Sequence, residues 1–174
     1  MGEHRPRDLA ASIDVVGAAL PRPQGLVLRR FSFEDRQWLA QLLKTNSVPE
    51  YDHLQQGDIL WMIDQVHPAT MVVAMLDGQP VGILAARPKG PFLHLLFMDV
   101  APGHQGNGIG SFLLKGLQRH AALVHRPIIA EVYTANTRAV HFYLRNAFEI
   151  VGRIPDYYEG GLDAHAIQWD PPLL

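Results

Sequence analysis

The sequence predicts an α+β fold of three layers, with one mixed, mostly antiparallel sheet of about six to seven strands and helices on both faces. Short apolar strand patterns alternate along the chain with segments of helical periodicity. Two of the strand patterns flank Asp77-Gly78, and Asp-Gly between apolar runs is a strong hairpin signal. The length of 174 residues and the 48% hydrophobic content are those of one globular domain.

The first 25 residues are expected to form an extension of the domain, which occupies residues 26–174. Three prolines interrupt this segment, while four apolar residues at helical spacing follow Asp8, a possible helix cap. These four are Leu9, Ile13, Val16 and Leu20. The extension therefore either carries a short amphipathic helix or is disordered.

The domain is expected to begin with a strand at residues 26–31, where the sequence is LVLRRF. Ser32 and Asp35 then open a helix through Lys44, and Pro49 ends this region. One helix or two short ones follow within residues 50–66. Further expected elements are strands at 70–76, 80–87 and 92–100, a helix at 109–124, a strand at 128–134, a helix at 136–146 capped by Asn136, and strands at 148–153 and 164–169. Both alternating sets of residues in the segment 92–100 are mostly apolar, which predicts a central strand covered on both faces.

Composition and charge limit the expected function classes, although the charge leaves nucleic-acid binding unsupported and does not exclude it. The 15 basic and 17 acidic residues give a net charge of −2, so nothing attracts the chain in general to nucleic acid or to anionic membranes. Without cysteine there is no disulfide, no Cys-ligated zinc and no covalent thiol intermediate. The longest apolar stretches are too short to span a membrane, and the first 20 residues do not resemble a secretory signal. A cytoplasmic enzyme or binding domain is expected, with no nucleic-acid or membrane partner.

Nine histidines raise the question of a metal site, but none of them shows a ligand spacing such as H-E-x-x-H. No metal is therefore expected.

The most specific feature is the glycine loop HQGNGIGSFLL, His104 to Leu114, which lies between a buried strand and the start of a helix. Glycines permit positive φ, and the free N–H groups and positive dipole end of a helix favour an anion such as phosphate. The alternative is a glycine-rich turn without a ligand. A nucleoside-triphosphate loop would need Lys-Ser/Thr after Gly110, where Ser111-Phe112 stands. A dinucleotide-binding fingerprint would need a third glycine where Ser111 stands. Glu131, about 20 residues further on, matches the acidic residue of that fingerprint and is the one feature that supports this alternative.

At this loop the sequence resembles the GNAT superfamily of acyl-coenzyme A N-acyltransferases, whose signature is Gln/Arg-x-x-Gly-x-Gly/Ala. Gln105, Gly108 and Gly110 match it, and so do MDVAP before the loop, NTRAVHFY after it and the order of strands, over residues 26–170. The resemblance implies a GNAT-type fold and an acetyltransferase that uses acetyl-CoA as acyl donor. It also implies a V-shaped cleft where the strand carrying Met98 to Val100 splits from the next strand.

The same resemblance implies the cofactor site. Backbone amides of the glycine loop would hold the pyrophosphate, namely those of Gln105, Gly106, Asn107, Gly108, Gly110 and Ser111. The backbone of Met98 and Val100 would pair with the pantetheine as a pseudo-strand, and Asn136 would add a side-chain contact. Tyr143 would lie beside the thioester.

Two residues are expected to carry the chemistry. Attack on a thioester requires a neutral amine, which favours a base. Glu131 is the one carboxylate in the apolar strand at 128–134, and burial is expected to raise its pKa into the range of a useful base, acting directly or through water. The alternative is a solvated or edge-facing glutamate. In the family pattern a tyrosine follows an Asn-x-x-Ala segment, and Asn136, Ala139 and Tyr143 match it, so the resemblance implies Tyr143 as proton donor to the departing thiolate. The alternative is a core tyrosine that packs the helix on the sheet.

The chain departs from the family pattern at the end of that helix, where Ala147-Phe148 stands in place of Gly-Phe. Alanine at a position with positive φ is strained by roughly 1 kcal/mol or more, unless Asn146 takes that conformation instead.

The resemblance implies that the acceptor is an amine. The segment RIPDYYEGGLDAHAIQW resembles the closing hairpin of the protein N-terminal and ribosomal-protein acetyltransferase branch through Tyr157, Tyr158, Asp163 and Ala164. The carboxylates around Tyr51, namely Glu50, Asp52 and Asp58, either attract a cationic amine or form a solvated helix face. Peptide or protein α-amines are therefore the first expectation. Small-molecule amines such as polyamines, amino acids and aminoglycosides are the alternative, together with a non-catalytic acyl-CoA sensor, and the oligomeric state stays open.

Overall fold

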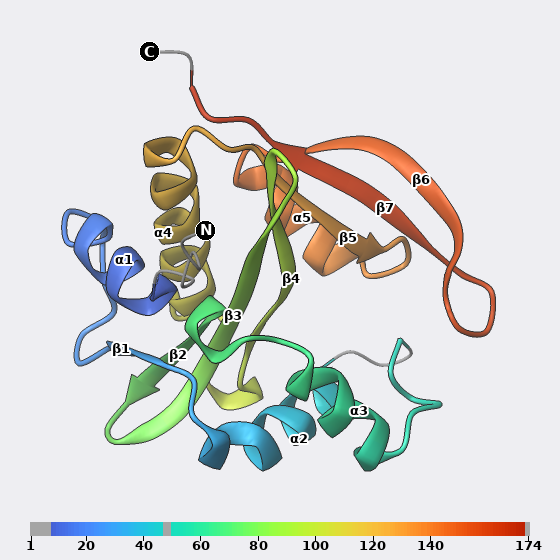
Figure 1. Cartoon of the computed structure of the whole chain (residues 1–174), viewed down its shortest axis with the longest axis horizontal. Coiled ribbons are helices and arrows are strands. Elements are labelled where there is room, and N and C mark those ends of the chain that lie inside the picture. The colour runs from blue at the N-terminus through green and yellow to red at the C-terminus, as the bar shows by residue number, and fades with distance from the viewer. Residues whose placement is uncertain (1–7, 47–49, 173–174) are drawn as a thin grey trace, which may run out of the picture.

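The computed structural model describes residues 8–46 and 50–172 and contains a seven-stranded sheet (Figure 1). The strands lie in the order β1-β2-β3-β4-β5-β7-β6, and every neighbouring pair is antiparallel except β4 and β5, which pair in parallel. This confirms the mixed, mostly antiparallel sheet. The strands are β1 (Val27–Arg30), β2 (Met71–Leu76), β3 (Gln79–Lys89), β4 (Phe92–Val100), β5 (Ile128–Tyr133), β6 (Glu149–Tyr158) and β7 (Leu162–Trp169).

Helices cover both faces of the sheet, as predicted. The helices are α1 (Leu9–Val16), α2 (Arg36–Asn46), α3 (Gln56–Asp64), α4 (Ile109–Leu123) and α5 (Thr137–Arg145). One buried cluster joins α1, α4 and α5 to one face, and a second cluster joins α2 and α3 to the other. The central strand β4 therefore lies between two apolar layers, which its continuous apolar sequence predicted.

Several local signals act where they were expected. Asp77 and Gly78 both have positive φ, 49° and 75°, and turn the chain from β2 into β3. Asn136 caps α5, because its Oδ1 accepts a hydrogen bond from the Ala139 amide at 3.1 Å. Residues 50–66 contain one helix, α3, and β6 runs five residues further than expected, through an irregularity at Asp156, whose φ is also positive.

The N-terminal segment forms α1, which packs against α4 (Figure 1). Asp8 caps this helix by accepting from the amides of Ala10 and Ala11. Ile13 is fully buried over Gly116 of α4, where an added Cβ would lie 2.5 Å from the Ile13 Cγ2. The close approach of the two helices therefore depends on a glycine in α4. The boundary between extension and domain at residue 25 stays a prediction.

The feature that creates the site is the divergence of β4 from β5. Only Leu93↔Ile128 and His94↔Ile129 pair across the two strands, although β4 continues to Val100 and β5 to Tyr133. In the same stretch β4 bulges at Leu96, because Ala85 pairs with Phe97 while Ala86 pairs with Leu95. Beyond the vertex at His94, the backbone groups of β4 that face β5 have no neighbouring strand.

The left-handed residue after α5 is Ala147 itself, with φ 63°, and not Asn146, whose φ is −100°. Asn146 instead donates from Nδ2 to the Phe142 carbonyl and accepts at its own carbonyl from Gln118 Nε2, which fixes the helix end. Because an L-residue in this region is strained, Ala147→Gly should stabilise the protein by about 1 kcal/mol. Urea unfolding measures this, with Ala122→Gly inside α4 as control. That control should lose about 1 kcal/mol, and a loss at both positions would contradict the assigned strain.

Candidate active site

Two cavities meet at the gap between β4 and β5. The larger, about 750 Å³, lies on the side of the glycine loop, α4 and α5, and the smaller, about 150 Å³, lies between the diverging strands and is also lined by Glu50, Tyr51 and Tyr158. Six residues line both cavities and so mark their junction: Asn46, Met98, Asp99, Asn136, Ala139 and Tyr143. Two molecules bound in the two cavities would therefore meet at these residues.

The glycine loop has the geometry of an anion site. Gly106 and Gly108 have φ of 79° and 84°, and Gly108 is the residue before the first turn of α4. The first backbone amides of α4 have no partner within the helix, and the first turn of α4 lines the larger cavity. The positive end of the helix dipole lies at this turn. Of the ten residues predicted to bind the cofactor, nine line this cavity, and only the exposed Asn107 does not.

The two glycines of the signature differ in what they require. Gly108 needs its positive φ, whereas Gly110 has an ordinary helical backbone, and a Cβ there would lie 3.7 Å from Val100 and Phe142. That distance is an ordinary van der Waals contact, so the second position accommodates alanine. This explains why the signature allows Gly or Ala at the second position and only Gly at the first.

The Gln105 side chain connects the glycine loop to β4 and α5 through hydrogen bonds. Its Nε2 donates to the Val100 carbonyl at 3.0 Å, and its Oε1 accepts from Arg138 at 2.9 Å. Arg138 and Arg145, seven residues apart on α5, both line the larger cavity. Neither arginine is among the site residues predicted from the sequence, although their spacing places them on one helix face and their charge suits a phosphate.

The backbone of Met98 and Val100 faces the gap. The Ala101 amide donates to the Val81 carbonyl of β3. Along an antiparallel strand the backbone groups of successive residues point alternately to the two sides, so one set of residues faces β3 and a second set, which includes the residue before Ala101, faces β5. Met98 and Val100 belong to the second set. The Val100 carbonyl already accepts from Asn46 and Gln105, which leaves its amide and both backbone groups of Met98 to pair with an extended ligand.

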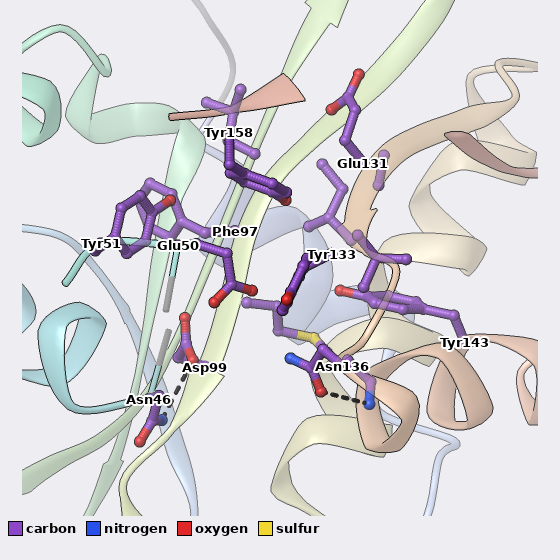
Figure 2. Close-up of a pocket in the computed structure, with 16 residues that line it drawn as sticks. Asn46, Glu50, Tyr51, Phe97, Asp99, Glu131, Tyr133, Asn136, Tyr143 and Tyr158 are labelled. Atoms are coloured by element: carbon purple, nitrogen blue, oxygen red, sulfur yellow. Dashed lines mark hydrogen bonds between the residues drawn. The ribbon is translucent and has the colours of Figure 1, made fainter. Parts of the chain in front are cut away.

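Tyr143 both packs in the core and reaches the junction. Its side chain is 9% exposed, and its ring makes edge contacts with Phe142 and Phe148. Its hydroxyl points into the space beside Asn136 and Tyr133 (Figure 2). Burial, together with the negative charge of Asp99, raises the pKa of Tyr143, so the phenol stays protonated and able to donate.

Glu131 lies on the face of β5 that was expected for it, because residues 128–133 alternate between buried and half-buried. The expected rise in its pKa is wrong. Burial does disfavour the carboxylate, but a 2.7 Å hydrogen bond from His94 Nε2, the positive potential of His94 and Lys89, and a hydrogen bond from the Tyr157 hydroxyl lower the pKa of Glu131 overall. In Figure 2 its carboxylate points away from Tyr143. Glu131 lines only the smaller cavity.

Two loops wall the outer side of the smaller cavity. Tyr51 follows α2 and Tyr158 ends β6, and both side chains line the cavity (Figure 2). Between these loops His53 Nε2 lies 2.8 Å from a carboxylate oxygen of Glu159. Asp163 holds the end of the β6–β7 hairpin, since it pairs with Arg153 and accepts from the Asp156 amide. Two tyrosines and a contact between the two loops therefore shape this side of the smaller cavity.

The smaller cavity also contains the carboxylates of Glu50 and Asp99 (Figure 2). The sequence did not predict that these two residues lie together. Glu50 is 8% exposed, and its Oε2 has no hydrogen-bond partner. Asp99 accepts a 3.2 Å hydrogen bond from Asn46 at the end of α2. Burial and the charge of Glu50 raise the pKa of Asp99 to about 7, and burial raises the pKa of Glu50.

Within residues 8–46 and 50–172, no group of three or more His, Cys, Asp or Glu side chains is arranged to hold a metal ion. No helix in the same part of the chain has the length and apolar content needed to cross a bilayer.

Comparison with known proteins gives consistent results. Residues 34–148 match the family model described as the acetyltransferase (GNAT) family. An uncharacterized N-acetyltransferase of Methanocaldococcus jannaschii is 26% identical over 141 residues, which cover 80% of this chain and 88% of that protein. A peptidyl-lysine N-acetyltransferase of Salmonella typhimurium is 28% identical over 131 residues, which cover 72% of this chain and 85% of that protein.

A solved structure with a similar fold is the ribosomal-protein-S18-alanine N-acetyltransferase of Escherichia coli. It superposes with a TM-score of 0.70 over 86% of this chain and 96% of that chain, at 15% sequence identity.

Proposed function

The chain belongs to the acetyltransferase (GNAT) family and is an acyl-CoA-dependent N-acetyltransferase with acetyl-CoA as co-substrate, and from this premise we propose that its acceptor is the α-amine of a peptide or protein. The junction of the two cavities at Tyr143 and Asp99 carries the proposal. Acetyl-CoA enters from the glycine-loop side, and the amine enters from the side of Tyr51 and Tyr158.

The cofactor is held by the residues predicted for it. Amides of Gln105, Gly106, Gly108, Gly110 and Ser111 bind the pyrophosphate, and the backbone of Met98 and Val100 pairs with the pantetheine. The Asn136 side chain lines the same cavity but uses its Oδ1 for the cap of α5, so its amide group is what it offers the pantetheine. Asn107, outside the lining, contributes at most its backbone amide.

The reaction is direct attack. The neutral amine nitrogen forms a bond to the thioester carbonyl carbon, the C–S bond breaks, and the thiolate takes the proton of the Tyr143 hydroxyl. One N–H proton of the attacking nitrogen then restores the Tyr143 phenol. Holding both reactants at the junction supplies much of the rate, because it replaces a bimolecular encounter in water.

The acceptor class is supported by the entrance. Tyrosines on two facing loops offer flat apolar surfaces with polar tips, which suit a peptide chain better than a small compact amine. The Escherichia coli protein of similar fold is named for an alanine of ribosomal protein S18. The Salmonella relative is named for peptidyl-lysine, so the lysine side chain is the second candidate, with small-molecule amines after it.

The test is an acetylation panel read by mass spectrometry. Acetyl-CoA is incubated with the protein and with peptides that have free N-termini, N-blocked lysine peptides, polyamines, amino acids and aminoglycosides. Acetylation of the free N-termini with the highest kcat/KM supports the proposal, and a preference for another class replaces the acceptor. Binding of acetyl-CoA without any transfer would instead support a non-catalytic sensor. The cytoplasmic location stays a prediction that cell fractionation tests.

Glu131 enters the proposal in a changed role, as a positioning residue for Tyr157. Its charge is held by His94 and Tyr157, so Glu131→Gln should lower kcat by less than about 10-fold, raise KM for the peptide, and leave the pH profile of kcat in place. Steady-state kinetics from pH 6 to 9 measure this. A loss of kcat of about 100-fold with a changed pH profile would make Glu131 the base after all.

A further inference from the structure

The deprotonation of the acceptor amine has no assigned residue once Glu131 is paired with His94. An α-amine is mostly an ammonium at neutral pH, so a group at the junction has to receive its proton. Asp99 is the one carboxylate among the six residues that line both cavities. Glu50 lies beside it in the smaller cavity (Figure 2).

We propose that Asp99, paired with Glu50, binds the acceptor as its ammonium ion and takes the proton that must leave before the nitrogen attacks. The proposal rests on the proposed function and names the proton acceptor of that same site. Asp99 is the catalytic base, and Glu50 supplies the second negative charge that holds the cation.

The first observation behind this assignment is an unmet need for a cation. Glu50 is more than nine-tenths buried, lines the smaller cavity and has a carboxylate oxygen without a partner. A buried carboxylate without a donor is costly, and an ammonium ion supplies both hydrogen bonds and the opposite charge. Two neighbouring carboxylates repel each other until a cation or a proton lies between them.

The second observation is the surroundings of Asp99. Asn46 donates to its Oδ1, Glu50 and Tyr51 approach it from the loop after α2, and Tyr143 approaches it from α5. Tyr133 of β5 and Tyr158 of β6 line the same cavity. Each of the titratable neighbours is an acid, and Asn46 is neutral, so none of these groups neutralises the charge of Asp99. Tyr143 and Asp99 therefore face the thioester with a proton donor and a proton acceptor.

The protons balance. The ammonium gives one proton to Asp99, the neutral nitrogen attacks, and the tetrahedral intermediate loses its second N–H proton to Tyr143 as Tyr143 protonates the sulfur. Asp99 then releases its proton to solvent. The products are the acetylated amine, coenzyme A and one proton.

The test compares Asp99→Asn with the wild type on two peptides that differ only at the N-terminus. One has an α-amine, and the other has an aminooxyacetyl group, which is neutral throughout the pH range used. Asp99→Asn should lose about 100-fold in kcat/KM at pH 7 on the α-amine and less than about 5-fold on the aminooxy peptide. Asp52→Asn, an exposed acid on the same loop, is the control and should change neither rate by more than about 2-fold. Equal losses on both peptides would overturn the proposal, because a damaged structure would not distinguish the two nucleophiles.

A pH profile of the wild type supports the test without any variant. The acidic limb of kcat/KM should have its midpoint near 7, the pKa of Asp99, and stay there when acceptors of different amine pKa are compared. In Asp99→Asn the limb should instead follow the pKa of each amine. A wild-type limb that follows the amine contradicts the proposal.

Binding of n-butylammonium chloride separates failure of this proposal from failure of the proposed acceptor class. In the presence of coenzyme A, the salt should raise the thermal midpoint of the wild type but not that of Asp99→Asn or Glu50→Gln, while butanol should have no effect. If the wild type acetylates no peptide but shows this protection, the acceptor class is wrong and the cation site stands. If it acetylates peptides and shows equal protection in all three proteins, the cation site is wrong.

Discussion

Replacing Tyr143 by phenylalanine should lower kcat by about 100-fold and leave the Kd for acetyl-CoA within about 3-fold of the wild type. The raised pKa of Tyr143 keeps its phenol protonated over the working pH range, so the hydroxyl donates to the departing sulfur and the variant has nothing to replace it. General acid catalysis contributes about 10²–10⁴-fold, and a thiolate is a good leaving group, which places the loss at the lower end. Single-turnover kinetics and calorimetric titration with acetyl-CoA measure the two quantities.

The control for this prediction is Tyr133→Phe. Tyr133 lines only the smaller cavity and is absent from the junction, so its hydroxyl should matter by less than about 3-fold in kcat. Loss of acetyl-CoA binding in Tyr143→Phe would make Tyr143 a packing residue, as its contacts with Phe142 and Phe148 allow. An unchanged kcat in Tyr143→Phe would mean that the thiolate departs without a proton from Tyr143.

Features that depend on neighbours in sequence were predictable. The turn at Asp77-Gly78, the Asn136 cap and the alternation of β5 each follow from backbone geometry within a few residues. The glycine loop belongs to the same class, because positive φ and free amides at a helix start are local properties. Five of the nine predicted cofactor residues that line the larger cavity belong to this loop, and the other four, Met98, Val100, Asn136 and Tyr143, were implied by the family resemblance and not by local geometry.

Features that depend on contacts between distant segments were not predictable from the sequence. The pKa of Glu131 falls because His94, 37 residues away, lies beside it at the last paired position of β4 and β5. Glu50 and Asp99 are 49 residues apart in the sequence and line the same cavity, beside Asn46 at the end of α2, which donates to Asp99 and to the Val100 carbonyl of β4. Burial alone would raise the pKa of Glu131, whereas its interactions with His94, Lys89 and Tyr157 lower it.

One available signal pointed to Asp99. Glu131 was selected as the only carboxylate in an apolar strand, and Asp99 is likewise the only carboxylate in the apolar segment 92–100. The same criterion applied to both strands gives two carboxylates on either side of the cleft. The structure then separates them, because Glu131 is already paired and Asp99 lies at the junction.

Replacing Gly108 by valine should weaken acetyl-CoA binding by roughly 100-fold, which corresponds to about 2.7 kcal/mol. Gly108 has φ 84° at the start of α4, and a β-branched residue avoids that conformation, so the loop would rearrange and turn its amides away from the pyrophosphate. An added Cβ at Gly108 meets no atom closer than 3.9 Å, so the effect comes from the backbone conformation and not from a clash. Loss of one or two charge-assisted hydrogen bonds accounts for the magnitude.

The matched control is Gly110→Ala, two residues further along the same loop. Gly110 has an ordinary backbone conformation, and its added Cβ would make van der Waals contacts at 3.7 Å with Val100 and Phe142, so binding should stay within about 3-fold of the wild type. Calorimetric titration of both variants with acetyl-CoA and with dephospho-coenzyme A locates the loss. In Gly108→Val the weakening should be equal for both ligands, because the loop holds the pyrophosphate that they share. A loss confined to acetyl-CoA would instead place the 3′-phosphate at the loop, and equal losses in Gly108→Val and Gly110→Ala would mean that bulk and not φ governs the site.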